Sequence, residues 1–476
     1  MPDYYNKNKE INLFPDLLVI GAGSAGFSSA ITAAEKGANV VIVGEGVIGG
    51  TCVNVGCVPS KTMIRAVETL HQANLASRFN GVEADAKITN WKSLVLQKQS
   101  LVDELRIAKY IDVLSAYKNI SYIEGRASFA DNGVMINDKL YTPKKVIIAT
   151  GSSASLPAIG GMTDVQHLTS TTALELEELP ESLLVIGGGV IGVELGQMFA
   201  RAGVKVTICC RSRLIPESEP EISKSLVGYL QDEEINVCTG IAYQKIEKTN
   251  NGILLTYDKN GQTHTIEAKK VLVTTGRRPN TANMGLENAG IETIKNSGIK
   301  VDKYMQTTNK NVYAVGDCTG ADMFVYMAAY GGKLAALNVI NGNNSSYDNT
   351  TMPSVIFSDP QIASVGLTEG GAKKLSYEVK TSLITLDHVP RFIAARDTRG
   401  LIKLIADKKT DKLLGAHILA PESGDMIQTI VIALKANMTT KSLGETIFPY
   451  LTGVEGLKLA AQTFDKDVSK LSCCAG

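Results

Sequence analysis

The sequence predicts an α/β protein with two dinucleotide-binding units of the βαβ type and a third, C-terminal unit of α+β type. A glycine-rich turn lies between a short apolar strand and a small-residue helix near residue 21, and the same arrangement recurs near residue 187. Beyond about residue 350 the pattern changes to strand-like runs without such a turn. With 476 residues, 44% of them hydrophobic and 20% charged, the chain is long enough for about three globular domains.

The charge balance argues against nucleic acid as a partner. Lys and Arg number 48, as do Asp and Glu, and no basic run with interleaved aromatic residues stands out. The first ten residues lack the apolar core of a signal peptide, and no apolar run is long enough to span a bilayer. We therefore expect a cytoplasmic protein without a membrane partner, in which the eight cysteines do not form a disulfide framework.

The first glycine-rich turn contains Gly21, Gly23 and Gly26 and follows the predicted strand 16–20. These glycines allow a tight turn and a close backbone approach, so that a pyrophosphate can lie at the N-terminus of the next helix. The following strand, 39–43, should end in a carboxylate that binds a ribose. Gly44 stands at that position, and Glu45 comes one residue later.

The second glycine-rich turn contains Gly187, Gly189 and Gly192. Two such turns, each in the correct context, imply two bound dinucleotides. The strand after the second turn ends without an acid for a ribose 2′-hydroxyl and is followed by Arg211 and Arg213, whose guanidinium groups can bind a 2′-phosphate. The sequence therefore favours NADPH over NADH, although Arg213 is about equally well explained as a solvated arginine.

Other segments have clear periodicity. Residues 92–116 are predicted to be helical, and a strand-like run is expected at 354–357, a hairpin from 401–405 to 413–418, and a helix at 425–436. Two further buried strands, each ending in a glycine, mark plausible domain boundaries at Gly151 and Gly276. The leucines and isoleucine predicted to form one buried face of the helical segment are Leu94, Leu101, Leu105 and Ile111.

Cys52 and Cys57, separated by four residues, are the strongest chemical signal. If Cys52 lies at a helix start, the backbone N–H groups and the helix dipole favour its thiolate, the form that attacks disulfides and binds soft metals. The pair is interpreted as a redox site, and the alternative is a structural disulfide or two buried thiols. The other internal cysteines are expected to be small buried hydrophobic residues rather than ligands: Cys209, Cys210, Cys238 and Cys318.

A second pair, Cys473 and Cys474, lies on the C-terminal tail. Such a tail should be mobile, and adjacent cysteines form a disulfide only with strain. They are therefore expected to remain a dithiol that grips a soft cation, the alternative being a functionless chain end.

With these features in view, the chain from about residue 14 onward resembles the FAD-dependent pyridine nucleotide–disulfide oxidoreductases. Asp317, in Gly316-Asp317, resembles the residue of that family that binds the flavin's ribityl chain, and Ala127, in Gly125-Arg126-Ala127, lies in a segment similar to the one near the adenine. The resemblance implies that Lys61 lies beside the flavin with Glu194 as its ion-pair partner. The full set implied for FAD is Gly21, Gly23, Gly26, Glu45, Gly46, Gly50, Thr51, Lys61, Ala127, Thr150, Gly151, Asp317 and Val325, and that for NADPH is Gly187, Gly189, Gly192, Glu194, Arg211, Arg213 and Gly276.

The resemblance also implies a domain division. The expected parts are an FAD-binding domain in residues 1–150, an NADPH-binding domain in 151–276, a second part of the FAD-binding or central domain in 277–350, and a dimerisation domain with the Cys-Cys tail in 351–476.

Tyr450 narrows the activity. Disulfide-reducing members of the family carry a His-Pro-Thr segment and a following Glu, because a thiolate leaving group needs a general acid. Here Tyr450 stands in place of that His, and a phenol with an ordinary pKa near 10 is a poor proton shuttle at neutral pH. Tyrosine could instead position a ligand.

Together with the tail, this substitution resembles the family members that reduce mercuric ion. The resemblance implies that Tyr110 is a second active-site tyrosine, with a half-buried aromatic on a helix as the alternative. It further implies a homodimer with active sites shared between chains, in which Hg(II) arrives as a thiol complex and is bound by Cys473, Cys474, Cys52 and Cys57. The alternatives are a disulfide reductase of the same family and a flavoprotein that binds thiophilic metals without turnover.

Overall fold

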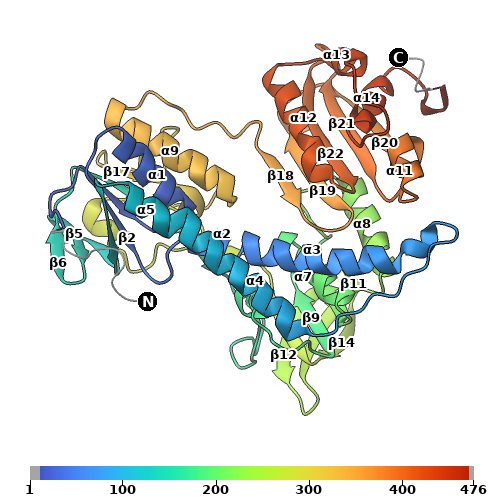
Figure 1. Cartoon of the computed structure of the whole chain (residues 1–476), viewed down its shortest axis with the longest axis horizontal. Coiled ribbons are helices and arrows are strands. Elements are labelled where there is room, and N and C mark those ends of the chain that lie inside the picture. The colour runs from blue at the N-terminus through green and yellow to red at the C-terminus, as the bar shows by residue number, and fades with distance from the viewer. Residues whose placement is uncertain (1–10, 471–476) are drawn as a thin grey trace. The chain divides into compact units, whose positions relative to one another are not determined.

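The computed structural model describes residues 11–470 and contains two compact units (Figure 1). The first unit is made of the described residues up to Thr62 together with Lys92–Ser155 and Gly276–Asp348. The second is made of Met63–Trp91, Leu156–Thr275 and the described residues from Asn349 onward. The chain leaves the first unit after Thr62, Ser155 and Asp348 and re-enters it at Lys92 and Gly276, so only one departure and one return lie close to the predicted boundary glycines.

A five-stranded parallel sheet forms the centre of the first unit. Its order is β17-β7-β1-β2-β3, and its strands are completely or largely buried, as expected where both faces of a parallel sheet are covered. Helices α1 (Ser24–Glu35) and α9 (Val325–Asn341) lie side by side (Figure 1). Gly332 permits this approach, because a Cβ there would lie 2.4 Å from the carbonyl oxygen of Ala25. The strands are β1 (Leu17–Ile20), β2 (Val40–Gly44), β3 (Ile120–Glu124), β7 (Lys145–Ile148) and β17 (Val312–Ala314).

The rest of the first unit surrounds this sheet. Short helix α2 (Gly50–Asn54) leads into α3 (Cys57–Asn74), whose later turns belong to the second unit. A small antiparallel sheet and a two-stranded pair complete the unit: β4 (Ala127–Ala130), β5 (Gly133–Ile136) and β6 (Lys139–Tyr141), and β8 (Ser152–Ala154) with β16 (Arg277–Pro279).

The second unit contains the second parallel sheet, in the order β11-β10-β9-β15. Helix α7 (Val190–Arg201) follows the second glycine-rich turn, and α8 (Pro220–Asp232) follows β10. The strands are β9 (Ser182–Ile186), β10 (Lys205–Cys209), β11 (Asn236–Cys238) and β15 (Lys270–Val273), and an antiparallel sheet is formed by β12 (Ala242–Lys248), β13 (Ile253–Lys259) and β14 (Gln262–Ala268).

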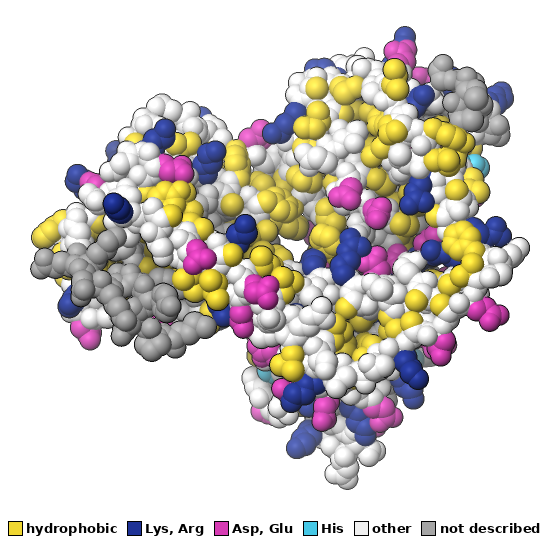
Figure 2. Space-filling view, viewed as in Figure 1, with side chains coloured by type: hydrophobic (Ala, Val, Ile, Leu, Met, Phe, Trp, Pro, Cys, Tyr) yellow, Lys and Arg dark blue, Asp and Glu magenta, His cyan; other side chains and the backbone are white. Residues whose placement is uncertain are grey.

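The C-terminal part of the second unit is a five-stranded antiparallel sheet with helices, which confirms the α+β prediction. The hairpin expected from 401–418 is β21 and β22, and the helix expected at 425–436 is α12. Yellow hydrophobic side chains are visible over this part in Figure 2, and exposed residues include Ile393, Ile432 and Ile447. The strands in order are β18 (Pro353–Ile356), β19 (Gln361–Gly366), β22 (Leu413–Ala420), β21 (Leu401–Asp407) and β20 (Val379–Thr385); the helices are α10 (Glu369–Lys374), α11 (Pro390–Ala394), α12 (Ser423–Lys435), α13 (Thr440–Glu445) and α14 (Glu455–Gln462).

The helical prediction for residues 92–116 is confirmed, but the predicted buried face is wrong. The segment comprises α4 (Trp91–Arg106), a π-helical turn (Ile107–Ile111) and α5 (Asp112–Ala116). Leu101 is 36% exposed, and Leu94, Leu105 and Ile111 are only half-buried. The buried residues of α4 are instead Trp91, Val95, Lys98, Val102 and Arg106. A search for apolar periodicity does not find this face because two of its residues, Lys98 and Arg106, are charged.

No helix within residues 11–470 has the length and apolar content needed to cross a bilayer.

Candidate active site

The cysteine-bearing segment packs directly on the first glycine-rich turn. Gly49 and Gly50 both have positive φ, 102° and 67°, which a side chain would strain. A Cβ at Gly50 would lie 2.6 Å from the Cα of Gly23. The backbone that carries Cys52 therefore touches the turn expected to hold a pyrophosphate.

Cys52 and Cys57 are both half-buried thiols. Cys52 lies inside the short helix α2, whereas Cys57 is the first residue of the long helix α3. The expected position of Cys52 near a helix start is found in α2, whose first turn contains it, and Cys57 holds the first position of the longer helix α3. A hydrogen bond to Cys57 and burial raise the pKa of Cys52 above its usual value, while the charge of Lys61 opposes the shift.

Tyr110 lies at this site. Its hydroxyl is 3.2 Å from Oγ of Ser24, the first residue of α1, and its ring packs edge-on against Phe27 with centroids 4.8 Å apart. Burial raises the pKa of Tyr110, and the charges of Cys52 and Cys57 add to the shift. Tyr110 belongs to the π-helical turn, a deviation that is common at functional sites. Tyr110 is thus half-buried on a helix and lies within electrostatic range of the Cys pair, and its role as an active-site residue stays a prediction.

Arg106 and Asn54 were not predicted as site residues. Arg106 is 8% exposed and donates from Nη1 to Oδ1 of Asn54 over 3.1 Å. Asn54 in turn donates to the carbonyl oxygens of Ile48 and Gly50, each at 2.9 Å. The pair fixes the turn before Cys52. The only sequence signal was an arginine one helical turn before Tyr110.

The first glycine-rich turn has the features required of an FAD site. Gly23 is the N-cap of α1 without a capping side chain, so the first N–H groups of the helix keep room for an anion. Gly21 has φ 122°, and a Cβ at Gly26 would lie 1.9 Å from the Gly21 carbonyl oxygen. Larger residues would distort this cradle. The residues present therefore fit a bound pyrophosphate.

Asp317 lies in a polar cluster of the first unit. Ser152 donates to its carboxylate over 2.6 Å, and Nε of Arg277 lies 3.9 Å from it. Burial lowers the pKa of Arg277, while the charges of Asp317 and Cys57 oppose that shift, which places this guanidinium within electrostatic range of the Cys pair. Arg277 was missed because the sequence argument stopped at Gly276.

The other residues expected around FAD are distributed over the first unit. Thr150 follows β7 and donates to the carbonyl oxygen of Asn280 over 2.7 Å. Ala127 is buried at the start of β4, and Val325 begins α9. The remaining positions are Glu45 and Gly46, exposed after β2; Gly151, with φ 70°; and Thr51, exposed in α2.

The second glycine-rich turn has the same construction in the second unit. Gly187 has φ 118°, and a Cβ there would lie 2.6 Å from the carbonyl oxygen of Thr274. Gly189 is the N-cap of α7 without a capping side chain, and a Cβ at Gly192 would lie 2.1 Å from the Gly187 carbonyl oxygen. Buried Glu194, on α7, accepts the N–H of Phe357 over 2.9 Å. Its pairing with Lys61 stays a prediction.

The two arginines after β10 differ. Arg211 is exposed, whereas Nη2 of Arg213 donates to the carbonyl oxygens of Pro216 and Ser218, each at 2.6 Å. Arg213 therefore holds its own loop, and Arg211 is the stronger candidate for a phosphate contact. Gly276 has φ 125° and accepts the N–H of Ser155 over 3.0 Å.

Tyr450 is 57% exposed on the loop before α14. Buried Glu455 accepts the N–H of Leu451, which has φ 59°, over 3.1 Å. The glutamate of the family segment thus shapes the loop that presents Tyr450. Cys473 and Cys474 lie outside the described residues.

Three of the four remaining cysteines are buried, as predicted, but Cys238 is only half-buried. A hydrogen bond from Cys209 lowers the pKa of Cys238 to about 6 against the effect of burial, with smaller contributions from Tyr257 and Lys259. Burial raises the pKa values of Cys210 and Cys318 to about 11. The prediction of a buried residue is therefore wrong for Cys238, which is half-buried beside Cys209.

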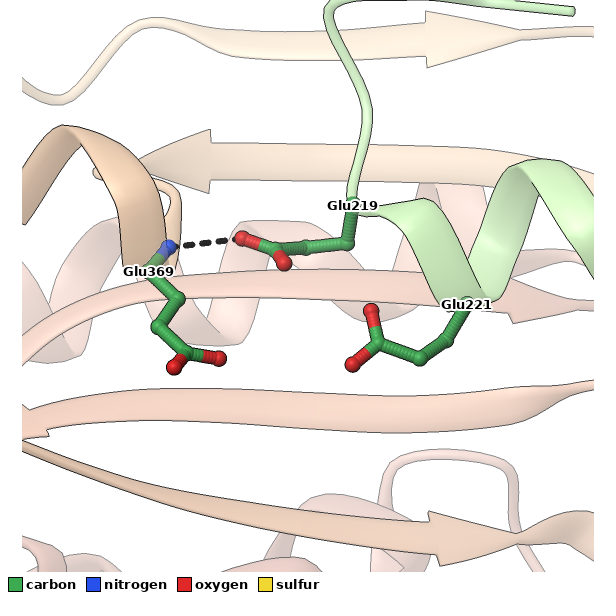
Figure 3. A group of neighbouring side chains, drawn as sticks. All are labelled: Glu219, Glu221 and Glu369. Atoms are coloured by element: carbon green, nitrogen blue, oxygen red, sulfur yellow. Dashed lines mark hydrogen bonds between the residues drawn. The ribbon is translucent and has the colours of Figure 1, made fainter. Parts of the chain in front are cut away.

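Three carboxylate groups of the second unit have oxygen atoms within 4.8 Å of one another, as the ligands of a metal ion do: Glu219, Glu221 and Glu369 (Figure 3). The N–H of Glu369 donates to Glu219 over 2.6 Å, as the dashed line shows. The Nζ of Lys403 contacts the three side chains at 2.8, 2.8 and 2.9 Å. The ammonium group of Lys403 takes the place that a metal ion would have. Because Glu219 and Glu221 lie at the start of α8 and Lys403 lies on β21, the cluster joins α8 to the C-terminal sheet.

Comparisons with known proteins agree on one family. Residues 15–332 match the model described as pyridine nucleotide-disulphide oxidoreductase, and residues 352–461 match its dimerisation domain. A mercuric reductase from Lysinibacillus sphaericus is 47% identical over 97% of this chain and 84% of its own length, and one from Streptomyces lividans is 44% identical over 97% and 98%. The solved Cu(II) complex of the HOCl-induced flavoprotein disulfide reductase RclA from Escherichia coli has a TM-score of 0.84 and 28% identity, covering 94% of this chain and 99% of that chain.

Proposed function

We propose a function for a chain that belongs to the pyridine nucleotide-disulphide oxidoreductase family: the reduction of Hg(II) to Hg(0) by NADPH, with FAD as the resident cofactor. Hg(II) takes up two electrons, and NADPH becomes NADP⁺ with release of a proton. The observation that carries the proposal is the packing of the Cys52–Cys57 segment on the first glycine-rich turn through Gly50 and Gly23. It holds two thiols beside the expected flavin site.

Bound FAD would supply hydride acceptance from NADPH and electron delivery to the thiol side of the site. The first glycine-rich turn and Asp317 would bind it, and the second glycine-rich turn and Arg211 would bind NADPH. The remaining residues proposed for each dinucleotide are those given by the sequence. Lys61, one turn after Cys57 on α3, contributes positive charge beside the pair.

The two thiols of the pair have distinct tasks. Cys57, at the start of α3, offers the sulfur that first displaces a carrier thiol from the metal. Cys52 then forms the second metal–sulfur bond, and its proton passes to the departing carrier thiolate. Tyr110 limits the space on one side of the pair and excludes water from it.

The dimerisation domain supports a homodimer. We propose that Hg(II) arrives as a small-thiol complex and that Cys473 and Cys474 of one chain transfer it to Cys52 and Cys57 of the other, with Tyr450 beside that pair. The exposure of Tyr450 is compatible with such a role. The domain division given by the sequence and a cytoplasmic location, where thiols stay reduced, belong to the same proposal.

The second candidate is a disulfide reductase, favoured by the fold shared with a flavoprotein disulfide reductase. Tyr450 argues against it because the general acid is missing. A binding flavoprotein without turnover is the third, but two glycine-rich turns that both fit dinucleotides serve no purpose in a protein that only sequesters metal.

The test uses the FAD-loaded protein and NADPH oxidation. Mercuric chloride with excess cysteine should accelerate NADPH oxidation and release volatile mercury, whereas oxidised glutathione or lipoamide should not accelerate it. Acceleration by a disulfide alone would favour the second candidate, and flavin reduction without turnover on any acceptor would favour the third. Mutation of both tail cysteines to Ala should slow the mercury reaction and leave reduction of the flavin by NADPH intact.

A further inference from the structure

A second pair of sulfur atoms is formed by strand pairing in the sheet of the second unit. Cys209, the last residue of β10, is the register partner of Cys238, the last residue of β11, and the two strands run parallel. Register partners on adjacent parallel strands point to the same face, and their strands are about 4.8 Å apart. The two thiols therefore lie next to each other although 28 residues separate them in the chain.

The surroundings of this pair are mostly apolar. Cys209 is completely buried in a hydrophobic cluster, and Cys238 packs against that cluster while remaining half-buried. The Oη of Tyr257 and Oδ1 of Asn236 each lie 4.0 Å from the Cys238 sulfur. One thiol thus gives access from outside, and the other lies inside the protein.

The spacing suits a cation that two sulfur atoms bind in line. Metal–thiolate bonds are about 2.3 Å long for zinc, so two sulfurs on opposite sides of a metal stand about 4.6 Å apart. Side chains on the same face of strands about 4.8 Å apart can reach such a separation. Zinc itself prefers four ligands in a tetrahedron, and two sulfurs with an exposed edge do not supply them. A soft ion of low coordination number fits better.

Net charge selects the ion further. Two thiolates and a divalent cation make a neutral group, which an apolar pocket can hold without the cost of a buried charge. A monovalent soft cation between two thiolates would leave a net negative charge there. The pocket therefore favours a divalent thiophilic cation.

We propose that Cys209 and Cys238 form a second Hg(II) site, separate from the cysteine pairs used in turnover. When a mercuric bis-thiol complex arrives, two mercury–sulfur bonds to the carrier break and two to Cys209 and Cys238 form. The two protein thiols give their protons to the two departing carrier thiolates, so no oxidant or reductant is needed. The proposal does not depend on the proposed reductase activity.

The test uses the full-length, FAD-loaded protein in which the turnover cysteines are removed by C52A, C57A, C473A and C474A. After treatment with a phosphine reductant, the protein is exposed to mercuric chloride with excess cysteine, passed through a desalting column and analysed for mercury by mass spectrometry. A single retained mercury ion per chain is expected. Adding C238A or C209A should lower the retained mercury at least about tenfold, as loss of a metal ligand does.

Two matched controls are C210A and C318A, which remove buried cysteines outside the pair. Both should retain the mercury. NADPH-driven flavin reduction in every variant verifies folding, and the half-buried C238A variant stays informative if C209A does not fold. The proposal is overturned if the starting protein retains no mercury, if C238A retains as much as its parent, or if C210A or C318A alone removes the ion.

Discussion

The two glycine-rich βαβ segments have the same local construction and different surroundings. In the first unit the turn is covered by a helix start with two half-buried thiols, and the polar groups around it include Tyr110, Arg106 and Arg277. In the second unit the equivalent segment is fastened to the C-terminal sheet by buried ions, and its sulfur pair lies in the sheet. Both glycine-rich segments are thus suited to bind a dinucleotide. The segments packed on them differ: those of the first unit carry the thiol pair, and those of the second unit carry the ions that fasten it to the C-terminal sheet.

Replacing Cys57 by Ala should have the largest effect on the chemistry that we assign to the first unit. Turnover on a mercuric thiol complex should fall about a thousandfold, or about 4 kcal/mol, because a group that acts as part of a catalytic unit is lost. Steady-state NADPH oxidation measures the change. The control is C318A, a buried cysteine of the same unit, which should keep turnover within about threefold. Equal losses in both variants would remove Cys57 from the mechanism.

Replacing Lys403 by Met should affect stability in the second unit. The free energy of unfolding should fall by about 3–5 kcal/mol, because three carboxylates lose their buried cation. Denaturant titration measures it, with K373M as the control, since Lys373 makes an exposed pair with Glu369 on one helix and should cost at most about 0.5 kcal/mol. If the two variants are equally stable, the cluster does not anchor α8.

The same cluster predicts a dependence on pH. Burial alone would lower the pKa of Lys403, but its hydrogen bonds to the carboxylates outweigh this effect and raise the pKa, so its contribution is complete below the ordinary lysine value of about 10.4 and is lost at higher pH. Burial raises the pKa of Glu221, but a hydrogen bond to Lys403, a backbone hydrogen bond and the charge of Lys403 together lower it below its usual value. Hydrogen bonds to Lys373 and Lys403 lower the pKa of Glu369. Their contribution is present above about pH 4.3 and is lost as the pH falls. The stability gap between the parent and K403M should therefore narrow in acid; a constant gap would contradict the ion cluster.

Asn54→Ala should produce a smaller change in the first unit. Without the bonds from Asn54 to the carbonyl oxygens of Ile48 and Gly50, the turn before Cys52 loses its fixed geometry. Mercury turnover should fall about tenfold, as it does when residues that orient metal ligands are lost, and the long-wavelength thiolate-to-flavin absorption should weaken. Asn74→Ala is the control, because Asn74 makes similar backbone bonds to Ala86 at the end of α3. A normal absorption band in N54A would show that Asn54 does not position the pair.

The sequence revealed what is local. Both glycine turns, the Cys52–Cys57 pair and most strands follow from spacing within a few residues. The structure confirms the turns and the strands and places Cys52 next to Cys57, whose redox role stays a prediction. The missed groups depend on contacts between distant segments: Arg106 and Asn54 are 52 residues apart, and Lys403 and Glu219 are 184 apart. Cys209 and Cys238 escaped for the same reason, since only the strand register brings them together. Cys52 lies in the first turn of the short helix α2, as expected, but the sequence did not show that a second, longer helix begins at Cys57.

The smallest expected effect distinguishes the two arginines of the second unit. Arg211 is exposed, so its contact with a 2′-phosphate would be screened, and R211A should raise KM for NADPH about fivefold without changing KM for NADH. Arg213 instead fastens the loop carbonyl oxygens of Pro216 and Ser218, and R213A should weaken both coenzymes alike. Steady-state titration with each coenzyme measures the ratio of the two KM values. Arg211 keeps its assigned role only if that ratio changes in R211A. A change found only in R213A would instead assign recognition of the 2′-phosphate to Arg213.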